Sequence, residues 1–391
     1  MEKILNFKIE QNKPKCCGCQ ACFNICPKKA IKMEDDEKGF KYPIIDEDKC
    51  VKCGLCRKVC PITNSCSNNN EIKAYACINL DENIRKHSSS GGIFSLLALE
   101  ILKQKGAVIG AAFDNDYKVK HICVENEKDL YKLYTSKYVQ SDINKMYAKT
   151  KELLNSGRMV LFTGTPCQIE GLYTFLNKDY KKLYTQDLIC HGVPSPKVWE
   201  LYKEFLEKEY NQKIKKIEFR NKEKGWKNYY IKVTFNDDTI YTNNNLKDTY
   251  LRLFLKDVIL RDSCYDCKFK KINRNSDITL ADLWGIEKIL PEFDDNKGTS
   301  LVVVNSNRGI ELFNSISDKM RYKEINLQEA IKNNVSMVTS ANKNKYIKTF
   351  FKKYQKRNFN IKRYTERVCK RKLSSKIKNA LKRLKNHIVQ K

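Results

Sequence analysis

The sequence predicts a mixed α+β and α/β fold, in which a small cysteine-rich domain precedes a larger mixed α/β domain and a basic helical tail. Three observations lead to this prediction. Nine of the 17 cysteines lie between Cys16 and Cys60, apolar segments of strand and helix length alternate beyond residue 71, and the chain from residue 341 onward is strongly basic. We therefore expect domains over residues 1–68, 71–340 and 341–391.

The composition favours a metal-binding protein of the cytoplasm. The 17 cysteines are clustered, and in a reducing compartment such clusters indicate metal binding or catalysis rather than disulfides. No apolar run approaches the roughly 18–20 residues of a membrane span. The N-terminal segment also lacks the apolar stretch and cleavage site of a signal peptide.

Two four-cysteine runs, each followed by proline, share one spacing, C-x2-C-x2-C-x3-C-P. The first run consists of Cys16, Cys19, Cys22 and Cys26, and the second of Cys50, Cys53, Cys56 and Cys60. This spacing is that of bacterial ferredoxins with two [4Fe–4S] clusters, where the fourth cysteine of each run ligates the other cluster. We therefore assign Cys60 to the first cluster and Cys26 to the second, and leave Cys17 without a ligand role. Structural zinc is the alternative, but it does not explain two identical runs that end in Cys-Pro.

Beyond residue 71, strand and helix patterns alternate. Strands are predicted over 72–79, 107–113, 119–124, 159–163 and 183–190, and helices over 93–105, 149–156, 169–176 and 197–210. Pro196 opens the last of these helices. Antiparallel strands over 217–219 and 229–235 flank a turn, and buried strands over 278–283 and 301–304 precede a helix over 310–316.

Four further cysteines stand in unusual settings. Cys167 and Cys190 follow predicted buried strands, and Cys264 and Cys267 form a C-x-x-C pair followed by lysines. Periodicity alone also allows each of them to be an ordinary buried thiol.

Two glycine-containing turns lie before helices, at residues 87–92 and 163–166. Free backbone N–H groups at a helix start bind anions, and glycine lets a phosphate come close. The candidate cofactor contacts in these turns are Ser89, Ser90, Gly91, Gly92, Gly164 and Thr165. An ordinary helix cap is the alternative for the first turn.

Two other segments supply candidate contacts. Residues 136–141 contribute Lys137, Tyr138 and Gln140, with a plain polar loop as the alternative. Asp282 and Trp284, at the end of a buried strand, either line a cofactor site or pack beneath a metal cluster.

The motifs GTPCQIEGL, LICHGVPSPK, SCYDCKFK, SDITLADLWGIEK and SKYVQS, taken together, resemble the family of coenzyme F420 hydrogenase and dehydrogenase beta subunits. The resemblance covers roughly residues 72–330. It implies a flavoprotein with a third [4Fe–4S] cluster, whose ligands are Cys167, Cys190, Cys264 and Cys267, and it makes FAD the expected guest of the glycine turns. An alternative keeps Cys264 and Cys267 as ligands but gives them other partners.

The resemblance also implies an oxidoreductase. Electrons would pass between an organic hydride carrier, with coenzyme F420 as the candidate substrate, and the ferredoxin clusters or a redox partner protein. No side chain is assigned as a catalytic acid or base. A ferredoxin-driven reductase of another substrate, for example in polysaccharide synthesis, and a non-catalytic electron-transfer protein are the alternatives.

The tail carries 19 lysines and arginines against one acid. Ile377, Leu381, Leu384 and Ile388 share one face of a predicted basic amphipathic helix, which suits an anionic membrane surface or an acidic partner. A solvated helix is the plain alternative, and nucleic-acid binding is a rival without a recognisable motif. The sequence assigns no role to Cys66, Cys77, Cys123 and Cys369.

Overall fold

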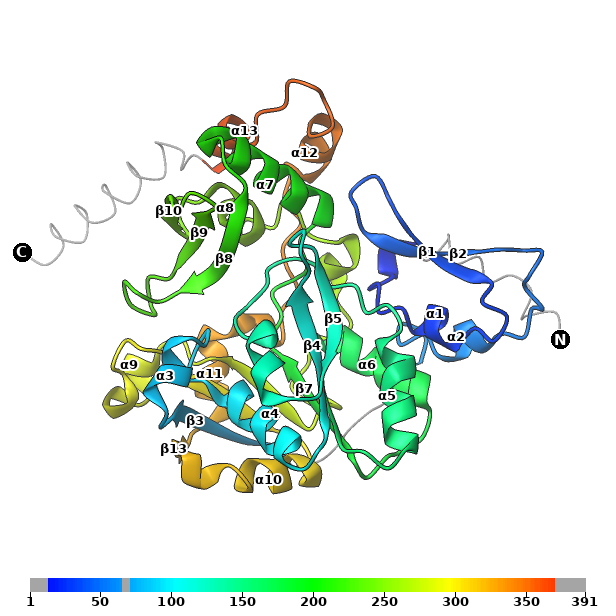
Figure 1. Cartoon of the computed structure of the whole chain (residues 1–391), viewed down its shortest axis with the longest axis vertical. Helices are drawn as coiled ribbons and strands as arrows, with labels where there is room; N and C mark the ends of the chain where they lie inside the picture. The colour runs from blue at the N-terminus through cyan, green and yellow to red at the C-terminus, as the bar shows by residue number, and fades with distance from the viewer. Residues whose placement is uncertain (1–12, 65–70, 370–391) are drawn as a thin grey trace, which may run out of the picture.

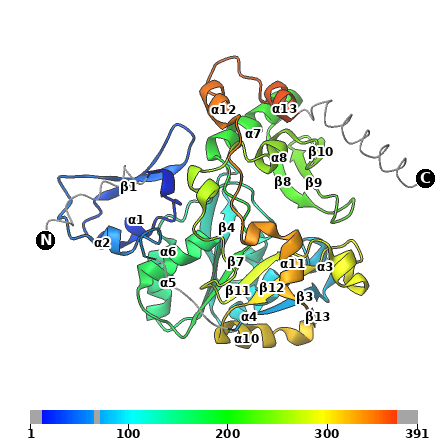
Figure 2. The ribbon, with the colours of Figure 1, turned by 180° about the vertical axis from the view of Figure 1, so that it is seen from behind.

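The computed structural model describes residues 13–64 and 71–369. A small module, blue in Figure 1, stands beside a larger body whose main sheet has eight strands. A three-stranded sheet with several helices lies over one end of that body, as both views show (Figure 2). The fold is therefore mixed α/β with a ferredoxin-like module at the N-terminal end of the described chain, as the sequence predicts.

The module consists of two cysteine loops around one hairpin. Strands β1 (Ile31–Asp35) and β2 (Lys41–Ile45) pair antiparallel. Each cysteine loop leads into a short helix, α1 (Ala21–Ile25) or α2 (Leu55–Lys58). The residues before these helices, Gln20 and Gly54, have positive φ angles of 65° and 75°, which turn the chain sharply between neighbouring cysteines.

The main sheet is parallel at its centre and antiparallel at both sides. Its strands are β3 (Lys73–Asn79), β4 (Ala107–Phe113), β5 (Val119–Val124), β6 (Val160–Gly164), β7 (Leu183–Leu188), β11 (Ile278–Asp282), β12 (Ser300–Val304) and β13 (Met320–Glu324). They lie in the order β13-β3-β12-β11-β7-β6-β4-β5. The central strands β11, β7, β6 and β4 are mutually parallel, so their carboxyl ends meet at one edge.

Helices cover both faces of this sheet because successive strand residues point to opposite sides. Helices α4 (Ile93–Lys103) and α10 (Asn307–Asn314) pack with Val108 on one face. Helices α5 (Met146–Asn155) and α6 (Pro166–Leu176) pack with its neighbour Ile109 on the other. Two shorter helices, α9 (Ile286–Ile289) and α11 (Leu327–Asn333), cover the β3 and β12 side of that second face, and α3 (Glu82–Lys86) follows β3.

The upper layer has its own aromatic core. Strands β8 (Ile214–Asn221), β9 (Tyr230–Phe235) and β10 (Ile240–Asn244) form an antiparallel sheet. It packs against four helices, α7 (Pro196–Tyr210), α8 (Thr249–Leu255), α12 (Ile347–Lys353) and α13 (Ile361–Cys369). Trp199 and Tyr202 are buried at its centre.

The predicted elements agree with the structure to within a few residues. The helix predicted from residue 169 begins earlier, at Pro166, because Gln168 Oε1 accepts a hydrogen bond of 2.9 Å from the backbone N–H of Thr165 and so caps the helix one turn sooner. The prediction did not include β10, β13 or α8, which are short.

The cysteine-rich module packs closely against helices α5 and α6 of the body. Cys17, Cys19, Ala21 and Val59 share one apolar core with residues of the body. Thr174 Oγ1 donates a 2.7 Å hydrogen bond to Val59 O, and Gln20 Nε2 donates one of 2.8 Å to Asp142. Gly171 on α6 has no side chain at the point of contact, where a Cβ atom would lie 2.8 Å from Cys19 Cβ.

The chain beyond residue 340 begins as part of the packed body, since Phe350, Phe351 and Ile361 belong to the upper core. The amphipathic helix predicted over residues 374–391 lies outside the described residues. The domain boundaries proposed from the sequence stay predictions. No helix within the described ranges has both the length and the apolarity to cross a membrane.

Replacing Gly171 by valine should loosen the contact between module and body. The new side chain would overlap Cys19 and the Tyr147 hydroxyl, each within 2.9 Å of an ideal Cβ atom. We expect a loss of about 1–3 kcal/mol in stability, as in other overpacked cores, and a lower thermal midpoint. Glu152→Val, on the exposed side of α5, adds a similar side chain away from the module and is the control. Equal midpoints for Gly171→Val and wild type would contradict the close contact.

Candidate functional site

The two four-cysteine runs lie close together in the module. Cys60 of the second run lies beside Cys16 and Cys22 of the first. Burial raises the pKa of Cys22, and the neighbouring Cys16 and Cys60 thiols raise it further. Burial, with Cys50 and Cys53 nearby, likewise raises the pKa of Cys56. We call Cys16, Cys19, Cys22 and Cys60 the proximal quartet, and Cys26, Cys50, Cys53 and Cys56 the distal quartet.

The two quartets differ in their surroundings. The proximal quartet contacts the body through Cys19, which is buried against Gly171. In the distal quartet Cys53 is exposed, and Cys26 Sγ accepts a 3.3 Å hydrogen bond from the backbone N–H of Ala30. The module therefore has one quartet at the body and one toward solvent, and the assignment of each thiol as a ligand stays a prediction.

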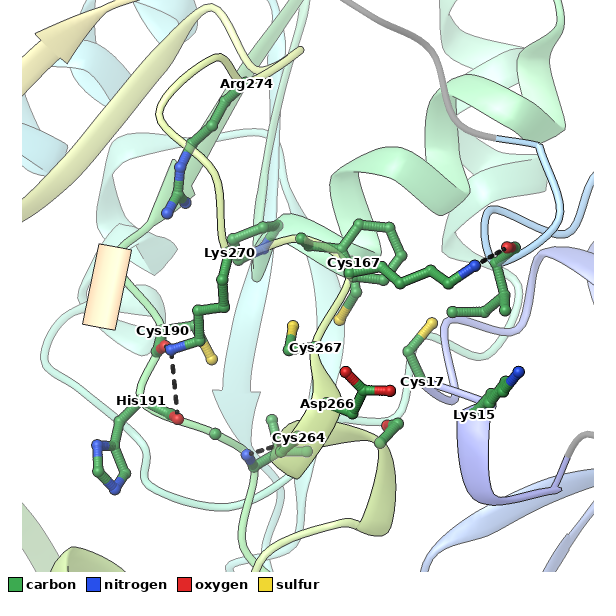
Figure 3. A pocket seen from close by; sticks show the side chains of 17 residues that line it. Lys15, Cys17, Cys167, Cys190, His191, Cys264, Asp266, Cys267, Lys270 and Arg274 are labelled. Carbon is green, nitrogen blue, oxygen red and sulfur yellow. Dashed lines mark hydrogen bonds between the residues drawn. The ribbon is translucent and has the colours of Figure 1, made fainter. Parts of the chain in front are cut away.

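The four cysteines singled out in the body line one pocket, which we call the thiol pocket (Figure 3). Cys167 lies at the start of α6, Cys190 follows β7, and Cys264 and Cys267 lie in or directly after the short helix η4 (Asp262–Asp266). A fifth thiol, Cys17 of the module, also lines this pocket. No pattern in the sequence places Cys17 there, since it falls outside the ferredoxin spacing.

The thiols of this pocket are held in a form that resists ionisation. A hydrogen bond with Cys17, together with burial, raises the pKa of Cys167. Burial raises the pKa of Cys190 to about 12, although the Lys270 ammonium opposes the rise. Such thiols ionise readily only beside a compensating positive charge, and a bound metal cluster supplies one. The donor set, four thiols from three segments of the chain, therefore fits a [4Fe–4S] cluster.

Hydrogen bonds fix the pocket walls. Cys264 Sγ accepts a hydrogen bond of 3.4 Å from the backbone N–H of Val193, and Thr165 Oγ1 lies 3.1 Å from Cys167 Sγ. Lys270 Nζ donates to Cys190 O and, at 2.7 Å, to Ser336 O. In the described parts of the chain, no three His, Cys, Asp or Glu side chains are arranged to hold a single metal ion.

A second cavity of about 510 Å³ opens beside the thiol pocket. It lies at the carboxyl ends of three parallel strands, where Thr163 and Gly164 end β6, Leu188 ends β7 and Asp282 ends β11. In open α/β sheets ligands bind at this edge. Its size is in the range of organic cofactor sites. We call it the sheet-edge cavity.

Most of the predicted cofactor contacts line the sheet-edge cavity. They are Ser89, Ser90, Gly92, Lys137, Tyr138, Gly164, Thr165 and Asp282. The other two predicted contacts lie elsewhere: the Gly91 N–H is bonded to Ser300 Oγ at 3.0 Å, and Gln140 Nε2 donates to Cys17 O at the module contact. Trp284 also lines the cavity.

Arg220 and Tyr229, which the sequence did not single out, line the same cavity. The Arg220 guanidinium lies 4.0 Å from the Tyr229 ring centroid, and its Nη2 donates to Asp282 Oδ1 at 2.9 Å and to Ser89 O at 3.2 Å. Among the described residues, its buried Nε has no hydrogen-bond partner. A buried cation with an unused donor fits an anionic or carbonyl-bearing ligand. Nothing in the local pattern FRNKEKGW distinguishes this arginine from its charged neighbours.

Two basic side chains of the cavity have lowered pKa values. Burial lowers the pKa of His121 to about 4, so the ring stays neutral, with Nε2 donating to Thr163 O at 2.9 Å and Nδ1 accepting from Ser141. Burial also lowers the pKa of Lys137 to about 7. Its Nζ donates to Tyr134 O at 2.7 Å. His121 therefore has a structural role, whereas Lys137 can change its charge when a ligand binds.

Two known domain families match this chain. Residues 157–330 match the family described as the C terminus of the coenzyme F420 hydrogenase/dehydrogenase beta subunit. Residues 15–64 match a 4Fe-4S dicluster domain. These two matches confirm the resemblance seen in the motifs of the chain.

Two curated relatives of this chain have coenzyme F420 in their names. A coenzyme F420-dependent sulfite reductase of Methanocaldococcus jannaschii is 24% identical over 342 residues, covering 80% of this chain and 47% of the relative. One of the subunits of the F(420)H(2) dehydrogenase of Methanosarcina mazei is 22% identical over 168 residues, covering 39% of this chain and 46% of the relative. The matches thus span about half the length of these relatives.

Among solved structures, a chain of the F420-reducing [NiFe] hydrogenase complex from Methanosarcina barkeri superposes with a TM-score of 0.47 at 19% identity. The superposition covers 71% of this chain and 98% of that one.

Removing the carboxylate of Asp282 should destabilise the cavity wall. Arg220 has a side chain only 2% exposed and pairs with Asp282, so Asp282→Ala leaves a buried cation without its partner. Breaking a buried pair costs about 3–5 kcal/mol, and the thermal midpoint should fall accordingly. The double variant Arg220→Met/Asp282→Ala should recover part of the loss. A double variant less stable than Asp282→Ala would show that the pair does not account for the effect.

Proposed function

We propose that this chain, which joins a dicluster ferredoxin domain to a domain of the coenzyme F420 hydrogenase/dehydrogenase beta-subunit type, is an iron–sulfur flavoprotein oxidoreductase. It would move electrons between an organic hydride carrier of the deazaflavin F420 type and its ferredoxin-type clusters. The observation that carries the proposal is the wall shared by the thiol pocket and the sheet-edge cavity. Residues 190–193, which begin with Cys190, line both the thiol pocket and the sheet-edge cavity.

The sheet-edge cavity suits FAD by its chemistry. Seryl and threonyl groups at the glycine turns, with the Arg220 guanidinium, offer donors to phosphate, and the Tyr138 and Trp284 rings offer flat apolar surface. Arg220 Nε supplies an unused buried donor. A bound flavin converts between the two electrons of a hydride and the single electrons that iron–sulfur clusters carry.

The protein's own part in this chemistry is positioning. Thr163, at the end of β6, is fixed by the neutral His121, so the glycine turn that follows has a defined backbone. Arg220 is fixed by Asp282, whose Oδ1 also accepts a 3.0 Å hydrogen bond from Trp226 Nε1. These contacts hold the cavity in shape before any ligand binds, which lowers the cost of ordering it.

The thiol pocket supports a route from the cavity to the module. Cys17 lines the thiol pocket and is joined by one peptide bond to Cys16 of the proximal quartet. We infer the order sheet-edge cavity, thiol-pocket cluster, proximal quartet, distal quartet. The exposed Cys53 then marks the side at which a redox partner protein exchanges electrons.

Counting cofactors after anaerobic purification tests the function. We expect FAD and, with three four-iron clusters, about twelve irons per chain. Cys264→Ser should lower the iron content to about eight while FAD remains. It should also end the oxidation of reduced F420 with a viologen dye as electron acceptor.

Cys123→Ser is the matched control, because Cys123 is a half-buried thiol outside the thiol pocket and both quartets. It should keep the full iron content. If no flavin copurifies and none rebinds, the flavoprotein assignment fails. If Cys264→Ser keeps all the iron, the third cluster fails. If the holoprotein contains both cofactors but does not oxidise reduced F420, the substrate assignment alone fails.

The low pKa of Lys137, about 7, makes ligand binding depend on pH. At about pH 8 this lysine is mostly neutral in the free protein, and the phosphates of FAD favour its charged form. FAD binding should therefore take up about one proton at about pH 8. At about pH 6 Lys137 is already charged, and the uptake should be far smaller. Calorimetry in buffers of different ionisation heat measures this uptake. Lys137→Met should abolish it, and undiminished uptake in that variant would assign the proton to another group.

A further inference from the structure

One arginine of the body reaches into the cysteine-rich module. Arg261 directly precedes η4, the short helix that contains Cys264, and its side chain is fully buried. Its backbone N–H donates a 3.0 Å hydrogen bond to Val193 O, in the wall between the two cavities. The residue is therefore anchored beside the thiol pocket while its guanidinium lies in the module.

The guanidinium is surrounded by groups of the module and one side chain of the body. Nε donates to Cys16 O at 2.7 Å, and Nη2 donates to Lys41 O at 3.0 Å. Nη1 donates to Gln140 Oε1 at 3.0 Å, and the Tyr42 ring centroid lies 4.1 Å away. Gly18 permits this approach, since a Cβ atom there would lie 2.9 Å from Nη1.

The contact of interest is with a thiol of the proximal quartet. Arg261 Nη2 lies 3.6 Å from Cys16 Sγ, within hydrogen-bond distance for sulfur. Among the described residues, Arg261 makes no ion pair with a carboxylate, and the neighbouring Asp262 pairs with Lys38 of the module at 3.0 Å. Burying a cation is costly unless a negative charge compensates it. The negative charge available to Arg261 is that of a thiolate-ligated cluster at Cys16.

Among the described residues, the distal quartet has no equivalent of this hydrogen bond from an arginine to a thiol. Within the described ranges, no lysine or arginine nitrogen is hydrogen-bonded to Cys26, Cys50, Cys53 or Cys56. The potential of an iron–sulfur cluster depends on hydrogen bonds to its sulfurs, on net charge and on exposure. The two clusters of the module therefore differ in the hydrogen bonds to their sulfurs and in their exposure.

We propose that Arg261 is a positioning residue that raises the reduction potential of the proximal-quartet cluster. Four thiolates give such a cluster a net negative charge, and reduction adds one more, so a fixed cation beside Cys16 favours the reduced form. The proximal cluster then becomes the favoured acceptor for single electrons that leave the thiol pocket. In that step one electron moves, the donor cluster is oxidised, the proximal cluster is reduced, and no proton or covalent bond changes. The proposal rests on the proposed function in taking Cys16 as a cluster ligand and a thiol-pocket cluster as the electron donor.

A redox titration of the anaerobic holoprotein, followed by electron paramagnetic resonance, tests this role. In Arg261→Gln one reduction wave should move to lower potential by at least about 59 mV, which is a tenfold change in a one-electron equilibrium. The other waves should stay in place. Arg261→Lys keeps a cation, although with a different shape, and should return the wave most of the way toward wild type.

Lys38→Gln is the matched control for a merely structural effect. Lys38 is also a cation that joins module and body, through Asp262, but in the described part of the chain its ammonium makes no hydrogen bond to a thiol. Its loss should leave all potentials unchanged.

The proposal is overturned if Arg261→Gln contains full iron and shows unmoved waves, or if Lys38→Gln moves the same wave equally. It is also overturned if Arg261→Lys behaves like Arg261→Gln. A wild-type protein without cluster signals would instead refute the ligand assignment of the proposed function, and the two failures are thus distinguishable.

Discussion

The parallel order of β6, β7 and β11 is the constraint on which both candidate sites depend. Parallel strands end at the same edge, and here those ends supply the glycine turn after Gly164, the Cys190 loop and Asp282. The same loops that border the sheet-edge cavity continue into the thiol pocket, through Cys167 and Cys190. The sheet-edge cavity and the thiol pocket are therefore neighbours along one edge of the sheet.

The sequence was most informative where chemistry requires fixed spacing or fixed turns. The ferredoxin runs, the body cysteines and the glycine turns were all recognisable, and the structure brings Cys167, Cys190, Cys264 and Cys267 into one pocket. Strand and helix positions in the main sheet followed from apolar periodicity. The elements β10 and α8 were not predicted, because β10 has no buried residue that would produce an apolar alternation and the nearly continuous apolar run of α8 does not distinguish a helix from a strand.

The residues that sequence reasoning missed act through tertiary contacts. Arg220 reaches Asp282 across 62 positions of the chain, and Arg261 reaches Cys16 across 245. A lysine-rich and arginine-rich sequence carries no local sign of which cation is buried. The two arginines also differ physically: Arg220 has a carboxylate partner, whereas Arg261 relies on a thiol and on carbonyl and ring contacts. Only the folded chain reveals that difference.

Gly192, in the wall between the two cavities, limits how this protein can change over evolution. A Cβ atom at this position would lie 2.8 Å from Leu260 and 3.3 Å from Cys264 Cβ. Any larger residue there would push on a cysteine of one site while it altered the lining of the other. A lineage that adapts the sheet-edge cavity to a new substrate must therefore leave this segment alone, or change both sites together. The Ser88–Ser90 turn, with Arg220 and Tyr229 at the ends of the β8–β9 connection, lines the sheet-edge cavity but not the thiol pocket, so changes there can reshape one site alone.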